Sequence, residues 1–299
     1  MSSTTPRAGG PTARASALFA LPALAVFVVF ALAPLAGAVV LSFVHWDGLG
    51  ALSWNGLANW TKVLHDPVTG NALLLTLKVM AASWVVQTPI SLLLGVFVAG
   101  RQRYRAVLAA LYFVPLLLSS AAVAIAFKAL LDPNFGIGGT PGLHFLAQNW
   151  LGDPTLVLYV VVFVIAWQFV PFHTLLYQAA VRQIPDSLYE AATIDGASRF
   201  QQFRYVTLPQ LRNTVVTSST LMVTGSLTYF DVVFVLTSGG PGNSTRLLPV
   251  DMYLTGFQAN DMGAASVLAV LLVVIGLSLA FVLTKFSGFS RMTSEQEGL

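Results

Sequence analysis

The sequence predicts an all-α integral membrane protein with six transmembrane helices and both termini in the cytoplasm. Three observations lead to this prediction. Hydrophobic residues make up 56% of the 299 residues and charged residues only 9%, whereas soluble domains are about 45–50% apolar and about 25% charged. Six apolar stretches are long enough to cross the roughly 30 Å hydrocarbon core of a bilayer. Lysine and arginine collect in alternate connecting segments.

The apolar stretches are expected at residues 17–44, 72–100, 106–131, 155–180, 213–236 and 264–286. The first is longer than the apolar core of a signal peptide, which has about 7–15 residues, so we expect it to remain as a membrane helix. These bounds divide the chain into a cytoplasmic tail (1–16), a transmembrane domain (17–286) that contains a cytoplasmic loop (181–212), and a C-terminal tail (287–299).

The orientation follows from the cations, because cytoplasmic loops of membrane proteins are enriched in lysine and arginine. Eleven of the 15 cations lie on the side that carries both termini and the loop 181–212. Only Lys62 and Arg246 lie in segments on the opposite side. The first side is therefore predicted to be cytoplasmic, and the second side to be the outer one.

Apart from Lys285 at the cytoplasmic end of the last stretch, three charged residues lie inside predicted spans. Lys78 and Lys128 are within about two turns of the outer end, where a long side chain can reach the interface. Asp231 is at similar depth in the fifth stretch, and a carboxylate in lipid is costly unless it is paired or capped. We therefore predict that Asp231 pairs with Lys78 or Lys128, or with backbone donors of the turn that follows.

Composition excludes several classes of site. The chain has no cysteine, which rules out disulfides and thiolate chemistry, and its four histidines lack metal-ligand spacing, so no metal is expected. Glycine-rich segments follow the third and fifth stretches, but neither continues into the Lys-Ser/Thr of a P-loop, so turns explain them better. A net charge of +3 in a membrane chain does not imply nucleic acid. A membrane enzyme would need His, Asp or Glu clustered at one depth, and no such cluster is present.

The longest strongly polar run between two apolar stretches is residues 190–209, EAATIDGASRFQQFRYVTLP. Ala191 and Ala192 allow a neighbouring backbone to approach closely, and Glu190 offers a carboxylate to a cationic partner. The alternative is an amphipathic helix resting on lipid headgroups. The run has no lysine-rich polar face, however, and acidic residues would repel anionic lipid. The pattern therefore favours a helix that docks on another protein.

The same run is expected to form two short helices. Asp186 or Ser187 can cap the first by accepting a hydrogen bond from an early backbone N–H. Gly196 interrupts it, because glycine adopts a left-handed conformation at little cost. Ser198 can cap the second helix, and Pro209 is expected to close the segment. The result would be a pair of helices, bent at a glycine, along the cytoplasmic face.

At these residues the sequence resembles the membrane-spanning permease subunits of ABC importers that work with a substrate-binding protein. Their loop signature reads EAA, three residues, then Gly, with a Leu-Pro pair further on; the matching positions here are Glu190, Ala191, Ala192, Asp195, Gly196, Ala197, Leu208 and Pro209. Three segments are similar to the carbohydrate branch, in particular to the first permease of maltose or glycerol-phosphate importers: GLANW (56–60), IPDSLYEAATIDGAS (184–198) and YFDVVFVLTSGGPGNST (229–245). With the apolar stretches, the resemblance covers most of residues 17–286.

The resemblance implies a type I importer permease fold in a bacterial cytoplasmic membrane. It implies three protein partners: a second permease subunit, expected to form a heterodimer with this one; a dimer of ATPase subunits; and an extracellular substrate-binding protein. In this family the glycine-bent helices dock on the ATPase, so Glu190 would make the electrostatic contact and Gly196 would set the angle of approach. The chain has no GxxxxGK[ST], so ATP and Mg are expected on the partner, and this chain is expected to bind no cofactor and to be no enzyme.

The substrate path is expected near the bilayer midplane. There the fourth and fifth stretches combine aromatic rings with small or hydrogen-bonding residues, namely Gln168, Phe169, Phe172, Gly225, Ser226 and Tyr229. Aromatic rings suit the C–H faces of a sugar, and polar groups suit its hydroxyls. Helix packing is the alternative, because small residues and aromatics also fill membrane bundles. The resemblance favours the path, although the asparagines and the tyrosine of the maltose-type pocket are not reproduced here.

Two other transport functions stay open. A proton- or sodium-driven secondary transporter would typically show internal repeats across its halves, and no repeat is evident in this sequence. An ABC importer for amino acids, peptides or oxyanions would share the loop signature. The segment 229–245 favours a sugar over these solutes, by resemblance.

Overall fold

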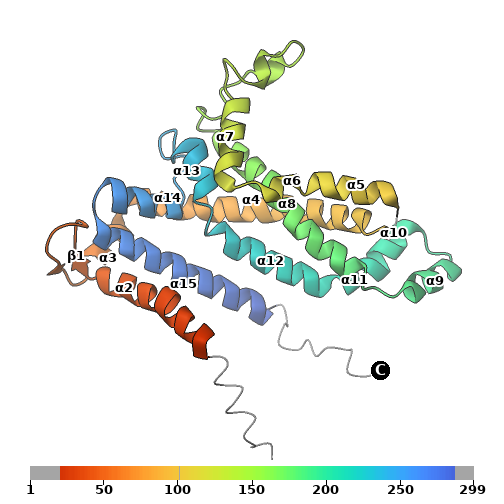
Figure 1. The fold of residues 1–299 in the computed structure, drawn as a ribbon, viewed down its shortest axis with the longest axis horizontal. Helices are drawn as coiled ribbons and strands as arrows, with labels where there is room; N and C mark the ends of the chain where they lie inside the picture. Colours follow the sequence, from red (N-terminus) through yellow and green to blue (C-terminus); the bar gives the residue numbers. More distant parts are fainter. Residues whose placement is uncertain (1–20, 101, 287–299) are drawn as a thin grey trace, which may run out of the picture.

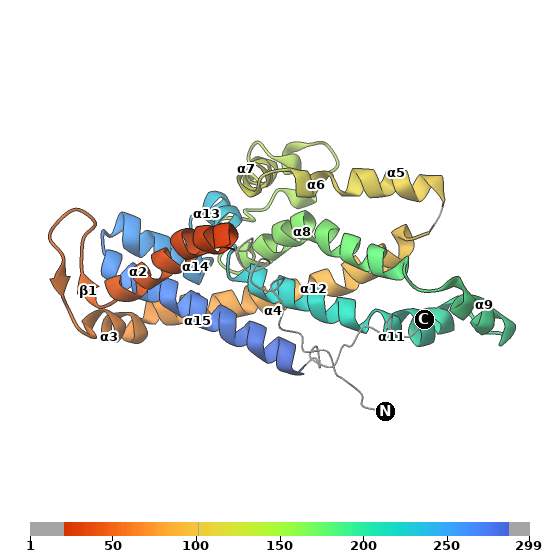
Figure 2. The same ribbon diagram turned by 60° about the horizontal axis from the view of Figure 1, so that its bottom comes forward.

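The computed structural model describes residues 21–100 and 102–286; the predicted tails 1–16 and 287–299 lie outside this range. The long helices run along one axis of the molecule (Figure 1). The polar segment, with α9 to α11, lies at one end of this axis, and the hairpin strand β1 lies with α3 at the other (Figures 1 and 2). The two regions that the sequence predicts on opposite sides of the membrane therefore lie at opposite ends of the molecule.

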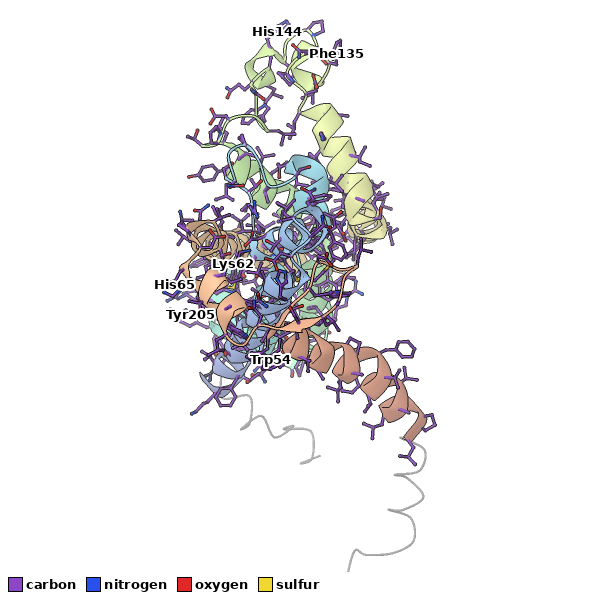
Figure 3. All side chains as sticks on the ribbon, turned by 90° about the vertical axis from the view of Figure 1, so that its left-hand side faces the viewer. Trp54, Lys62, His65, Phe135, His144 and Tyr205 are labelled. Atoms are coloured by element: carbon purple, nitrogen blue, oxygen red, sulfur yellow. The ribbon has the colours of Figure 1, made fainter. Side chains whose placement is uncertain are left out.

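The first apolar helix, Leu21–Leu41, agrees with the first predicted span. It contains a π-helical turn, η1 (Val28–Leu32), followed by α2 (Ala33–Leu41), and leads into an antiparallel hairpin of β1 (Val44–His45) and β2 (Ser53–Trp54), then α3 (Ala58–His65). Buried Asn59 joins these elements, because its Nδ2 donates to the carbonyls of Ser42 at 3.1 Å and Val44 at 2.8 Å. The asparagine of the GLANW segment thus has a structural role. Figure 3 shows Trp54, Lys62 and His65 at this end of the molecule.

The centre of the fold is the pair α4 (Pro67–Val98) and α8 (Val157–Val181). Asp66 caps α4 by accepting the Val68 N–H at 2.9 Å. The two helices approach closely at Gly95, where a Cβ would lie 2.5 Å from the Cβ of Tyr177. Any larger residue at this position would push the helices apart, so glycine permits the packing of the core.

The third predicted span, 106–131, is not one continuous helix. The chain forms α5 (Arg103–Tyr112), α6 (Val114–Leu117) and α7 (Ser120–Leu130), and Leu118 and Ser119 between the last two are extended. Ser119 caps α7 by accepting the Ala122 N–H at 3.2 Å. The prediction of an unbroken helix was wrong because hydropathy does not register this cap. Beyond α7 a loop with two short 3-10 turns, η2 (Ile137–Gly139) and η3 (His144–Leu146), projects from the bundle (Figure 1).

The fifth predicted span is bent. It consists of α12 (Arg212–Ser226) and α13 (Asp231–Thr237), which meet at 47°. A turn rich in glycine leads to α14 (Leu248–Tyr253), which the sequence analysis did not predict, then to η5 (Leu254–Gln258) and α15 (Met262–Phe286). Within the described residues, four helices are long and apolar enough to cross a membrane, and the bent pair would make a fifth. These helices make the chain an integral membrane protein.

An ion pair joins α3 to the start of α15, where Lys62 Nζ lies 2.6 Å from Asp261 Oδ2. Partial burial raises the pKa of the Asp261 carboxyl, but the hydrogen bonds from Lys62 and the Ala264 N–H outweigh burial and hold the pKa below its usual value of 3.8. The side chain of Lys62 is 66% exposed, so the pair is expected to contribute less than about 1 kcal/mol.

This pair predicts a pH dependence of stability. Because the folded pKa of Asp261 is lowered, its contribution is complete above the unfolded pKa of 3.8 and is lost as the pH falls through the folded pKa. Asp261→Asn keeps an oxygen that can accept the Ala264 N–H but removes the charge. At about pH 6 the wild type should therefore have a higher melting temperature than this variant. The difference between the two melting temperatures should shrink at about pH 3. Thermal unfolding of the purified protein measures this. A difference that stays constant with pH would contradict it.

Candidate functional site

The predicted pair of short helices is present at the end of the bundle. They are α9 (Asp186–Ile194) and α10 (Arg199–Gln202), followed by a π-helical turn η4 (Phe203–Thr207) and α11 (Leu208–Gln210). Two details of the prediction were wrong. Pro185 occupies the N-cap position of α9 and no side chain caps it, so Asp186 lies in the first turn. Pro209 does not end the segment, since it lies within α11, which continues from η4 in helical conformation.

Gly196 forms the bend between α9 and α10. Its φ is +75°, in the left-handed region that glycine adopts without strain. The N–H of Ala197 donates to the Ala192 carbonyl at 2.8 Å, and the N–H of Gly196 donates to the Thr193 carbonyl at 3.0 Å. These two bonds form a Schellman motif, which satisfies the last carbonyls of α9. The need for a left-handed residue at the end of α9 therefore explains the glycine in the Asp195-Gly196-Ala197 part of the signature.

A capping box begins α10. The N–H of Ser198 donates to Gln201 Oε1 at 2.7 Å, and the N–H of Gln201 donates to Ser198 Oγ at 3.4 Å. Gln202 adds a bridge across the bend, since its Nε2 donates to Thr193 Oγ1 and to the Ala197 carbonyl, both at 3.1 Å. The Ser198 cap was predicted from the sequence, whereas the role of Gln202 was not.

A second bridge holds α9 against η4. The hydroxyls of Tyr189 and buried Thr207 lie 2.9 Å apart. A double-mutant cycle with Tyr189→Phe and Thr207→Val should give a coupling free energy of about 0.5–1.5 kcal/mol, the usual net value of one hydrogen bond. Thermal unfolding of the four proteins measures it. Strictly additive single effects would show that this bond does not fix the angle of α9.

This segment exposes apolar side chains at the end of the molecule. Exposed fractions are 86% for Ile194, 71% for Phe200 and 70% for Tyr205. Glu190 and Ala191 are exposed, and Ala192 is half-buried. Large apolar side chains that gather on a polar segment usually mark a protein contact. The signature residues Glu190 and Ala191 therefore lie on a segment suited to docking.

A cavity of about 430 Å³ lies between α8 and the bend of α12 and α13. It is lined by Leu116, Ser120, Phe169, Phe172, His173, Leu221, Gly225, Thr228, Tyr229, Phe230, Asp231 and Val232. Four of the six residues predicted for the substrate path are among them. The rings of Phe169 and Tyr229 lie 5.5 Å apart with an interplanar angle of 30°. The cavity combines aromatic faces with hydroxyl groups at the break of a membrane helix.

The other two predicted path residues do not line this cavity. Gln168 is buried, and its Nε2 donates to the Leu118 carbonyl at 3.3 Å and to Ser120 Oγ at 3.2 Å. Gln168 thus supplies a hydrogen-bond donor to the carbonyl of Leu118, one of the two extended residues between α6 and α7. Ser226 is also buried and donates to the Val223 carbonyl of its own helix at 2.7 Å. Both residues support the breaks that shape the cavity.

Asp231 lines the cavity from the first turn of α13. Among the described residues, no ion pair joins it to Lys78 or Lys128, so the predicted pairing is not observed in this chain alone. Its position in the first turn is favourable for a negative charge. The third predicted arrangement, with backbone donors, stays a prediction.

A buried ion pair that was not predicted from the sequence joins α14 to the turn before it. Asp251 on α14 is 1% exposed, and Arg246 Nη2 lies 2.7 Å from its Oδ1. Arg246 Nε donates to the same oxygen at 2.8 Å, and Thr69 Oγ1 of α4 donates to Oδ2 at 3.0 Å. This triad fixes the glycine-rich turn and α14 to the start of α4.

Comparison with known proteins assigns the fold and the family. A family model described as "Binding-protein-dependent transport system inner membrane component" matches residues 90–288. The chain is 32% identical to the "Probable ABC transporter permease protein YurN" of Bacillus subtilis (strain 168), over 90% of this chain and 94% of the relative. It is 30% identical to the "Trehalose/maltose transport system permease protein MalF" of Thermococcus litoralis, over 92% of this chain and 94% of the relative.

A solved structure shares the fold. A chain from a bacterial ABC transporter involved in the import of the acidic polysaccharide alginate superposes with a TM-score of 0.81, at 21% identity, over 94% of this chain and 97% of that chain. This similarity shows a helical membrane permease fold of the MetI type. In such systems a separate ATPase hydrolyses ATP, so the permease is not itself an enzyme. The family model and the two relatives agree, and this chain belongs to the family of inner membrane components of binding-protein-dependent transport systems.

Proposed function

We propose that this chain is a permease subunit of an ATP-driven, binding-protein-dependent sugar importer in a bacterial cytoplasmic membrane. The observation that carries the proposal is the exposed pair α9 and α10, bent at Gly196 and fixed by hydrogen bonds across the bend. A rigid docking element at one end of a membrane bundle suits force transfer from a soluble partner. Family membership supports the same assignment.

In the proposed arrangement the chain crosses the membrane six times, with both termini in the cytoplasm. Four long helices and the bent pair α12 and α13 account for five crossings, and the broken series α5, α6 and α7 accounts for the sixth. The excess of lysine and arginine on the side of the loop 181–212 supports this orientation. The loop then faces the cytoplasm.

The proposed partners follow from this orientation. A dimer of ATPase subunits, which would bind ATP and Mg, docks on the loop through Glu190, Ala191, Ala192 and the bend at Gly196. A second permease subunit completes the translocation path, and a substrate-binding protein delivers cargo on the outer side. Leu208 and Pro209 continue the docking segment into α12, because α11 lies between the two.

The proposed cargo is a sugar. The relative named for trehalose and maltose supports this class. The cavity beside the bend offers Phe169, Phe172 and Tyr229 to the C–H faces of a sugar ring, and Gly225 leaves room beside them. An importer for a non-sugar solute is the second candidate, because the docking segment itself is independent of cargo.

Purification of the intact complex tests the proposal. An associated ATPase and a second permease should co-purify, and proteoliposomes should accumulate an oligosaccharide only when ATP, Mg and the binding protein are supplied. ATP-independent counterflow by this chain alone would instead identify a secondary carrier. ATP-driven import of amino acids without import of any sugar would favour the second candidate.

A further inference from the structure

The lining of the cavity beside the bend of α12 and α13 includes a negatively charged residue. Among the described residues that line it, Asp231 is the one carboxylate, and there is neither a lysine nor an arginine. In the described parts of the chain, Lys62 pairs with Asp261 and Arg246 pairs with Asp251, and no ion pair joins Asp231 to another described residue. The negative charge of Asp231 is therefore not neutralised by an ion pair with any residue that the structure describes.

The remaining polar groups of the cavity are neutral hydroxyls and one imidazole. Thr228 is exposed, and its hydroxyl donates to the Gly225 carbonyl at 2.7 Å, which leaves its oxygen able to accept. His173 is buried and its Nδ1 lies 2.9 Å from Ser218 Oγ, so Nδ1 is occupied by a neighbouring helix. Such groups can exchange hydrogen bonds with hydroxyls, whereas the described lining offers no guanidinium or ammonium group to receive an anion.

A carboxylate accepts hydrogen bonds from hydroxyl groups but repels another anion. At about 5 Å and an effective dielectric constant of about 20, two negative charges repel strongly enough to reduce binding on the order of 100-fold. We propose that this cavity accepts uncharged sugars and excludes sugars that carry a carboxylate, sulfate or phosphate group. This selectivity rests on the proposed function, and it assigns Asp231 a role in choosing the cargo.

The charge in the cavity can be measured without knowing the sugar, because the chain contains no cysteine. Thr228→Cys places one thiol in the lining. The intact complex is treated with a cationic (trimethylammonium-ethyl), an anionic (sulfonatoethyl) and a neutral (methyl) methanethiosulfonate, and labelling of this chain is followed after its separation by electrophoresis. The ratio of cationic to anionic rates should exceed that of a free thiol in solution at least tenfold.

Asp231→Asn in the Thr228→Cys background is the matched variant, since it keeps the size and removes the charge. Its rate ratio should fall at least fivefold towards the value in solution, and Asp231→Glu should retain the high ratio. An unchanged ratio of cationic to anionic labelling rates in the Asn variant would show that Asp231 is not the source of the negative charge in the cavity, and would overturn the proposal. Failure of all three reagents to label the thiol would show that the cavity is closed to small solutes, which would also overturn the proposal.

Uptake tests the selectivity itself. Proteoliposomes with the complex and its binding protein receive neutral oligosaccharides from starch, cellulose, mannan and chitin, or the same pool after oxidation of primary hydroxymethyl groups to carboxylates. A neutral sugar should accumulate about 100-fold more than its oxidised counterpart, and Asp231→Asn should narrow this ratio about tenfold. Equal import of both pools would overturn the selectivity alone. Import of neither pool would overturn the proposed sugar transport, and the two failures are thus distinguishable.

Discussion

Gly196→Pro is expected to reduce ATP-driven uptake at least tenfold while the protein remains in the membrane. Proline fixes φ near −65°, whereas residue 196 has a φ of +75°, and it removes the N–H that donates to the Thr193 carbonyl. The angle between α9 and α10 must therefore change. Uptake and ATP hydrolysis, measured together in proteoliposomes, should show hydrolysis continuing with little transport.

Gly196→Asn is the matched control. Asparagine tolerates the left-handed region, and no atom lies within 4 Å of a Cβ added at this position, so uptake should stay within about twofold of wild type. Glu190→Lys is expected to uncouple in the same way by reversing an exposed charge without altering the bend. Normal accumulation in the proline or the lysine variant would contradict the docking role of the segment.

Asp251→Ala is expected to destabilise the folded protein by about 3–5 kcal/mol, the usual cost of removing one partner from a buried ion pair. Arg246, whose side chain is only 22% exposed, would lose its partner, and the Thr69 hydroxyl would lose its acceptor. Size-exclusion thermostability of the detergent-solubilised protein should show a clearly lower melting temperature. Lys62→Ala, which breaks the exposed pair, should cost less than about 1 kcal/mol.

A second variant separates charge from packing at the same place. Arg246→Met combined with Asp251→Leu removes both charges and keeps apolar volume, so it should recover most of the stability lost in Asp251→Ala. If the double variant is as unstable as the single one, the loss would come from packing of α14 and not from an unpaired arginine. An unchanged melting temperature in Asp251→Ala would contradict the importance of the triad.

The sequence predicted the long helices well and their breaks poorly. Hydropathy locates α4, α8 and α15 within a few residues, because their length and apolar content are averaged over many positions. The break before α7 depends on two extended residues and one serine cap, which change hydropathy little. The 47° bend of the fifth stretch is equally invisible to an average over about 20 residues.

The residues of the candidate site were also predicted with uneven success. The bend at Gly196 and the cap at Ser198 were predictable because both depend on residues adjacent in sequence. Gln168 was placed in the substrate path because its position along the fourth stretch gives its depth in the membrane but not the neighbour that its side chain meets. The triad of Asp251 was missed because Thr69 is 182 positions away in the sequence. Short-range signals were informative, and long-range contacts needed the fold.

The helix α12 joins the two parts of the site directly. It follows α11 at the docking segment and ends beside the cavity, and its 15 residues span about 22 Å. A tilt of about 10° at one end of a rod of this length displaces the other end by roughly 4 Å. That displacement is larger than the radius of a sugar ring. Because α12 converts a small rotation of the docking segment into a larger displacement beside the cavity, such a rotation would suffice to change whether the cavity can hold its cargo.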